Sequence, residues 1–183
     1  MRLTLSWLRR GREGAGGPDR AGTAGQSNLE GAGLGELIGA LPDELRREAL
    51  THSSWTEERT DSYERLALLG DSVLGLSVAD ELYRTLPDLN AGALTKILNQ
   101  VVSGASCAEV GRELGIPDML LAADPGVTDG KQTPARLLLE GERPLPEITE
   151  AMIGACYLHH GFLLTAAAVT AAFRPKMASV QEN

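Results

Sequence analysis

The chain has 183 residues, of which 43% are hydrophobic, 23% are charged and only 4% are aromatic, so it is long enough for one domain with a buried core. The scarcity of aromatic residues favours helices and argues against a β-sandwich or β-barrel. The formal net charge of −8 at pH 7 argues against a protein that binds nucleic acid through charge alone, because phosphate binding relies on lysine and arginine.

The N-terminal segment gives no sign of export or membrane insertion. No apolar run in the sequence reaches the roughly 20 residues that a membrane span needs, and MRLTLSWLRRGREG meets arginines before the apolar core of an export signal forms. We therefore expect a cytoplasmic protein without membrane contact. Cys107 and Cys156 lie far apart without zinc-ligand spacing, which predicts buried thiols.

The sequence divides into three parts. Residues 1–32 are rich in Gly, Ala, Ser and Arg without periodicity, which predicts a disordered basic tail. Residues 33–178 are expected to form one helical domain, and residues 179–183 a short C-terminal tail.

Apolar periodicity and breaking residues predict about eight to nine helices and no strands, so the expected fold class is all-α. Ser106 is expected to cap the fifth of these helices, and Gly115 to end it. Polar or glycine-rich and proline-rich loops are expected at 52–61 and 124–130, with a short turn after Pro117. In chain order the expected helices cover residues 33–38, 43–50, 62–84, 94–102, 106–114, 133–139, 147–160 and 163–177.

Two pairs of carboxylates stand at helical spacing. Glu64 and Asp71 are seven residues apart and so lie within about 20° on one face of the long helix. Glu147 and Glu150 are neighbours on the first turn of a later helix. If the two helices pack together, the acids can hold a magnesium ion, because a hard cation relieves the repulsion of clustered carboxylates. Spacing alone equally fits ordinary solvated acids at helix surfaces.

Four sequence blocks resemble the ribonuclease III family, in the order and spacing of that family. The resemblance covers roughly residues 33–177 and implies an all-α endonuclease domain that forms a homodimer through its signature helix. It also implies cleavage of double-stranded RNA, such as ribosomal and messenger RNA precursors, with Mg²⁺ or Mn²⁺ and no small-molecule cofactor, leaving 5′-phosphate ends. The blocks are ALTHSSW (49–55), YERLALLGDSVL (63–74), LTKILNQVVS (94–103) and ITEAMIGACYLHHGF (148–162).

The resemblance assigns roles to the two acid pairs. It implies metal ligation by Asp71, Glu147 and Glu150, and catalytic roles for Asp71, Glu150 and Glu64. With an activated metal-bound water in the mechanism, His52 is expected to be structural rather than a general base.

Contact with RNA is expected from local cations, each of which equally fits a solubilising surface charge. The first candidates are Lys96, Arg65 and Lys131, followed by Arg136 and Arg143. Aromatic and histidine side chains receive no role: Trp55 and Tyr63 are expected to pack, and His159 and His160 to form a surface pair.

The chain departs from the family pattern at the site. Ala67 stands where the family sequence ERLEFLGD has a metal-binding Glu, Ala91 replaces a further acid, and Glu147 stands where Asp is usual. Three carboxylates still suffice for one Mg²⁺ at reduced affinity, so we expect an attenuated endonuclease. The alternative is a catalytically silent dimer that binds structured RNA as a scaffold. The chain ends at Asn183, about where the family linker to an RNA-binding domain begins, so we expect a catalytic domain without it.

Overall fold

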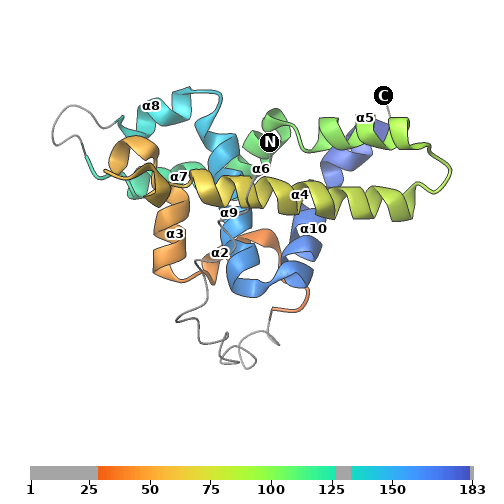
Figure 1. Cartoon of the computed structure of the whole chain (residues 1–183), viewed down its shortest axis with the longest axis horizontal. Helices are drawn as coiled ribbons and strands as arrows, with labels where there is room; N and C mark the ends of the chain where they lie inside the picture. The colour runs from red at the N-terminus through yellow and green to blue at the C-terminus, as the bar shows by residue number, and fades with distance from the viewer. Residues whose placement is uncertain (1–28, 127–132, 182–183) are drawn as a thin grey trace, which may run out of the picture.

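The computed structural model describes residues 29–126 and 133–181, and every regular element in these ranges is helical, which confirms the predicted fold class (Figure 1). Two short 3₁₀ turns, η2 (Ser53–Trp55) and η3 (Arg59–Asp61), lie in the predicted polar loop. The α-helices are α2 (Leu34–Gly39), α3 (Asp43–Leu50), α4 (Glu64–Thr85), α5 (Ala91–Val101), α6 (Gly104–Glu113), α7 (Ile116–Ala122), α8 (Ala135–Glu140), α9 (Pro144–His160) and α10 (Phe162–Gln181).

Several boundaries differ from the sequence prediction. Helix α9 begins at Pro144 rather than at Glu147, because proline is tolerated in a first turn whose N–H groups lack helical partners. Glu150 therefore lies in the second turn and is partly buried, not on the surface of the first. Helix α10 runs from Phe162 to Gln181, so it is longer than the predicted helix at 163–177. Leu29 and Ala32 also pack against the core.

The predicted cap of α6 was wrong by three residues. The Oγ of Ser103, not that of Ser106, takes the capping position and accepts a hydrogen bond from the backbone N of Ser106 at 3.3 Å. Both serines fit the capping preference, so the sequence pattern did not separate them. The predicted end of the helix is confirmed, since Gly115 adopts the left-handed conformation with φ of 72°.

Helices α4 and α9 form the centre of the fold and make the most extensive contact between any two described elements. In Figure 1, α9 crosses behind α4. A Cβ atom added at Gly70 would lie 1.8 Å from the carbonyl oxygen of Glu150, and one added at Gly154 would lie 2.2 Å from that of Leu66. The two backbones are thus in direct contact, and the acids of α4 are brought beside those of α9.

Buried apolar side chains surround this crossing, while α4 keeps one apolar stripe exposed. Leu68, Leu76 and Tyr83 on α4 are 73%, 57% and 74% exposed. None of the described helices is both long enough and apolar enough to cross a membrane. The largest fully buried side chains are Phe173, Leu37, Ile38, Leu74, Leu82, Ile116, Leu120, Ile148, Met152, Ile153, Val78 and Val101.

Candidate active site

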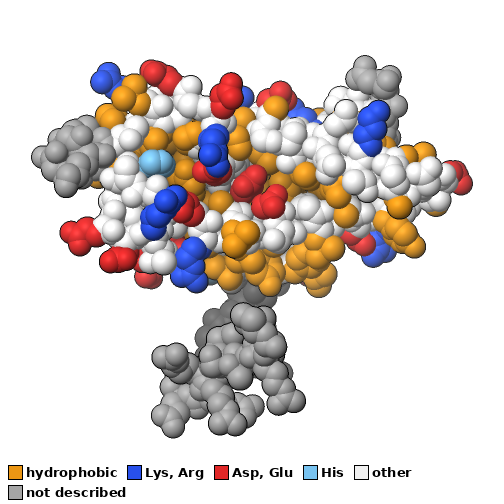
Figure 2. Space-filling view, turned by 45° about the horizontal axis from the view of Figure 1, so that its top comes forward, with side chains coloured by type: hydrophobic (Ala, Val, Ile, Leu, Met, Phe, Trp, Pro, Cys, Tyr) orange, Lys and Arg blue, Asp and Glu red, His pale blue; other side chains and the backbone are white. Residues whose placement is uncertain are grey.

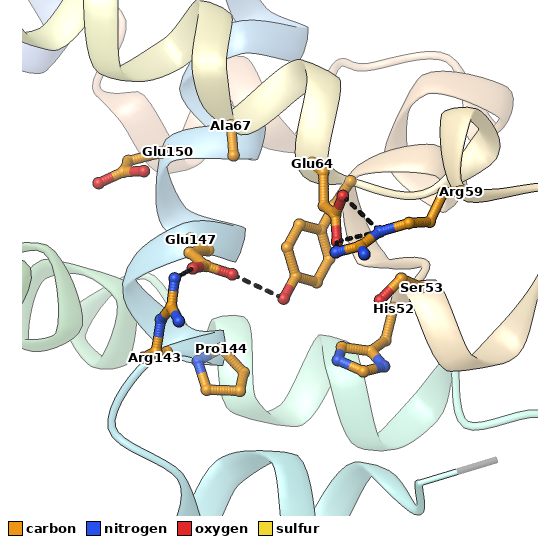
Figure 3. Close-up of a pocket in the computed structure, with 10 residues that line it drawn as sticks. His52, Ser53, Arg59, Glu64, Ala67, Arg143, Pro144, Glu147 and Glu150 are labelled. Carbon is orange, nitrogen blue, oxygen red and sulfur yellow. Dashed lines mark hydrogen bonds and ion pairs between the residues drawn. The ribbon is translucent and has the colours of Figure 1, made fainter. Parts of the chain in front are cut away.

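A polar hollow of about 540 Å³ lies where the start of α4 meets the start of α9 (Figure 3). Three of the four acids predicted from sequence line it, and Asp71 does not. The hollow therefore brings together residues that are about 80 positions apart in the chain. Its lining residues are His52, Ser53, Arg59, Tyr63, Glu64, Ala67, Arg143, Pro144, Glu147 and Glu150.

Glu64 is neutralised by an arginine from the preceding loop. The Arg59 guanidinium donates from Nη2 to Oε1 at 2.6 Å and from Nε to Oε2 at 3.1 Å, a two-pronged contact. This hydrogen bond from Arg59 lowers the pKa of Glu64. Glu64 is thus a carboxylate with its own counter-ion, lying across the hollow from Glu150 in Figure 3.

Glu147 has two partners. Its Oε2 accepts a hydrogen bond from the hydroxyl of Tyr63 at 3.0 Å, and its Oε1 lies 3.2 Å from Nη2 of Arg143. The contact with Tyr63 joins the starts of α4 and α9.

Glu150 and Asp71 differ from Glu64 and Glu147 because they have no basic partner in the described part of the chain. Among the described residues neither forms an ion pair with lysine or arginine. Burial, followed by the charges of Asp71 and Glu147, raises the pKa of Glu150 to about 7. Asp71 is exposed, and its charge contributes to raising the pKa of both Glu150 and the buried thiol of Cys107 in α6, so it lies near enough to the crossing to act on both. The crossing thus carries negative charge that no described side chain offsets.

Ala67 leaves the middle of the site without a carboxylate. It is 7% exposed and lies between Glu64 and Glu150 along the wall of the hollow in Figure 3. Within residues 29–126 and 133–181, no three His, Cys, Asp or Glu side chains converge as a preformed metal cluster.

The donor set nevertheless fits a magnesium-type cation. Such an ion keeps several waters and takes one or two protein carboxylates together with substrate phosphates. Asp71 and Glu150 supply two hard oxygen donors whose mutual repulsion a cation would relieve, and Glu147 is the adjacent third.

The model for ribonuclease-III-like domains matches residues 42–176 of the chain. The chain belongs to the ribonuclease III family. It is 40% identical to ribonuclease 3 of Corynebacterium jeikeium over 140 residues, and this alignment covers 75% of this chain and 54% of the relative. It is 42% identical to ribonuclease 3 of Rhodopirellula baltica over 118 residues, and this alignment covers 64% of this chain and 41% of the relative. The chain thus spans about half the length of the curated relatives it matches.

Solved structures of the ribonuclease III family share the fold. The nuclease domain of ribonuclease III from Campylobacter jejuni superposes with a TM-score of 0.65 at 26% identity, covering 78% of this chain and 95% of that one. That structure concerns flexibility in the region involved in dimer formation of the Campylobacter domain.

The cations expected to contact RNA are dispersed. Arg143 borders the acidic hollow of this ribonuclease III domain. Arg65 instead lines a separate hollow on α3, η3 and α4, together with Glu44 and Asp61. Lys96 on α5 and Arg136 on α8 are exposed. The predicted contact Lys131 lies outside the described residues, as do residues 1–28 of the predicted tail.

Sequence reasoning missed several contacts at this ribonuclease III site. Tyr63 was given no role, and Arg59 was not considered, although each hydrogen-bonds an acid of the hollow. His52 fits the structural role predicted for it, since its Nδ1 accepts a hydrogen bond from the backbone N of Ser54 at 3.1 Å and burial lowers its pKa. The predicted surface pair was wrong for His160, which is buried with Nε2 2.9 Å from the carbonyl oxygen of Leu37.

Proposed function

We propose that the protein is a divalent-metal-dependent endoribonuclease that cuts double-stranded RNA. The observation that supports this most is the pair Asp71 and Glu150 at the α4 and α9 crossing, whose negative charge has no protein counter-ion among the described residues. In this proposal Asp71 and Glu150 hold Mg²⁺ or Mn²⁺, and Glu147 is the third ligand.

The residues of the site divide the remaining tasks. A bound cation supplies a water of lowered pKa and stabilises charge that develops on the scissile phosphate. Asp71 and Glu150 fix the position of the ion, and Glu64, already paired with Arg59, orders that guanidinium at the edge of the hollow. Ala67 contributes no donor, so we propose reduced metal affinity and slower cleavage than a site with a glutamate there.

The exposed stripe of α4 supports a homodimer. Leu68, Leu76 and Tyr83 recur at about two-turn spacing on one face of the helix. Between Leu68 and Leu76, a Cβ atom added at Gly75 would have no neighbour within 4 Å. The α4 helix of a second copy of the chain can therefore approach closely there. Figure 2 shows hydrophobic side chains gathered along one edge of a face otherwise mixed in charge. An apolar stripe of this kind favours burial against a second copy of the chain.

The proposed substrate is duplex RNA, such as ribosomal and messenger RNA precursors. Duplex RNA is recognised by its shape, phosphates and 2′-hydroxyls, and exposed cations such as Lys96, Arg65 and Arg143 fit phosphate contacts. With a net charge of −8, binding is expected to be weak and to fall steeply with salt concentration.

A cleavage assay tests the proposal. Long double-stranded RNA is incubated with Mg²⁺ or Mn²⁺ and with the wild type, Asp71→Asn, Glu150→Gln or the control Asp80→Asn, an α4 acid that is ion-paired with Arg84. We expect cleavage by the wild type and the control, and a loss of about 100-fold or more in the two site variants. Cleavage that survives both site substitutions would remove these acids from the mechanism.

Ala67 specifically favours a second candidate, a catalytically silent dimer that binds structured RNA. This second candidate predicts that the wild type slows the migration of double-stranded RNA in a gel but does not cut it in the presence of either Mg²⁺ or Mn²⁺.

A further inference from the structure

The carboxylate of Glu147 is shared between two partners of different kinds. One oxygen, Oε2, accepts the hydroxyl hydrogen bond of Tyr63 at 3.0 Å, and the other, Oε1, pairs with Arg143 at 3.2 Å (Figure 3). Each oxygen of a carboxylate accepts more than one contact, so the two partners leave part of Glu147 available to a cation.

The two partners differ strongly in burial. Tyr63 is only 3% exposed, and among the described residues Glu147 is the sole hydrogen-bond partner of its hydroxyl. Burial holds the ring of Tyr63 in place, and a partly buried hydroxyl that loses its partner costs stability, so this contact is expected to persist. The Arg143 side chain is 88% exposed and, as a solvated ion pair, exchanges readily with water.

We propose that Tyr63 is a positioning residue that fixes the Glu147 carboxylate, and that Arg143 is an exchangeable counter-ion which a divalent cation displaces from Oε1. This inference rests on the proposed function, in which Glu147 is a ligand of that cation. It assigns Oε1 as the ligand oxygen and Oε2 as the oxygen held by the protein.

The positioning contact matters more in this chain than at a site with a full set of acids. Ala67 supplies no donor, so each remaining carboxylate contributes a larger share of the binding. A glutamate also has one more rotatable bond than an aspartate, and a fixed hydrogen bond to one oxygen removes that freedom before the ion arrives. Partners that orient a metal ligand typically change metal affinity by 10- to 100-fold when they are removed.

Calorimetric titration with Mn²⁺, in the absence of RNA, tests the inference on the full chain. The variants are Tyr63→Phe, Arg143→Gln and Glu147→Gln, with Tyr157→Phe as the matched control, since Tyr157 is a partly buried tyrosine without a hydrogen bond to a carboxylate in the described part of the chain. Thermal unfolding of each variant establishes that it folds.

The two partners predict opposite effects. Tyr63→Phe is expected to weaken Mn²⁺ binding about 10-fold, whereas Arg143→Gln is expected to tighten it by roughly 2- to 5-fold, because a competing cation is removed. Tyr157→Phe should bind as the wild type does. A merely structural role of both side chains would not produce changes of opposite sign.

Two different failures are distinguishable. If Glu147→Gln weakens binding but Tyr63→Phe does not, or if Arg143→Gln weakens it, the roles inferred for these partners are overturned while the metal site stands. If the wild type does not bind Mn²⁺, or Glu147→Gln binds it with unchanged affinity, the participation of Glu147 in the proposed site fails, and this inference fails with it.

Discussion

Replacing Glu150 with glutamine is expected to stabilise the metal-free protein at pH 8 but hardly at pH 4.5. The pKa of Glu150 is raised from 4.5 to about 7, first by burial and then by the charges of Asp71 and Glu147. Because the unfolded chain loses this proton near pH 4.5 and the folded chain only near pH 7, the free energy of unfolding falls as the pH rises through that window.

The size of this effect follows from the same two values. The difference between the pKa of Glu150 in the folded and in the unfolded chain corresponds to about 3 kcal/mol of unfolding free energy. Solvent screening of a partly exposed carboxylate reduces this to about 1 to 2 kcal/mol. Glutamine keeps the shape and loses the charge, so Glu150→Gln should recover this amount at pH 8. Asp71→Asn, which removes one source of repulsion, should recover part of it.

Urea unfolding followed by circular dichroism, in a chelating buffer at pH 4.5 and pH 8, measures the effect. Asp80→Asn, on the same helix as Asp71 but ion-paired with Arg84, is the control and should show no such gain at pH 8. A gain from Glu150→Gln that is the same at both pH values would refute the reasoning, because the effect would then not depend on ionisation.

Three further predictions concern the same helices. Ala67→Glu should tighten Mn²⁺ binding about 10-fold in calorimetry and raise the cleavage rate. In a chelating buffer it should lower the free energy of unfolding. An unchanged affinity for Mn²⁺ would mean that residue 67 does not face the ion. Gly70→Ala should lower the free energy of unfolding in urea by about 3 kcal/mol or more, since its Cβ would lie 1.8 Å from a backbone oxygen of α9. The control is Gly39→Ala, whose Cβ would have nothing within 4 Å. Equal effects of the two substitutions would contradict the close crossing of α4 and α9. Leu76→Glu should shift the protein from dimer to monomer in light scattering without unfolding it, and a persistent dimer would place the interface elsewhere.

Much of the fold was predictable because its signals are local. The apolar periodicity of residues 62–84 predicted one long helix, and the structure has α4 at Glu64–Thr85. Glu64 and Asp71 on α4, and Glu147 and Glu150 on α9, were recognised as pairs from spacing alone.

The contacts of the acids were not predictable from spacing. Tyr63 and Glu147 are 84 positions apart, so no local pattern connects them. Arg59 lies in a loop whose path is set by tertiary packing, and its pairing with Glu64 follows from that path. His160 was expected at the surface because it ends a helix, but its contact partner, the carbonyl oxygen of Leu37, comes from α2. Long-range packing thus supplies the uncharged partners of Glu147 and His160, whereas the ion pair of Arg143 with Glu147 stands at the local i, i+4 spacing.

Anomalous scattering from crystals grown with Mn²⁺ tests the central claim most directly, because it locates the ion relative to α4 and α9. We predict one strong peak bonded to carboxylate oxygens of both Asp71 and Glu150, at about 2.1 Å, the distance of a hard six-coordinate cation. A Mn²⁺ peak bound elsewhere, with none between these two side chains, would contradict the account.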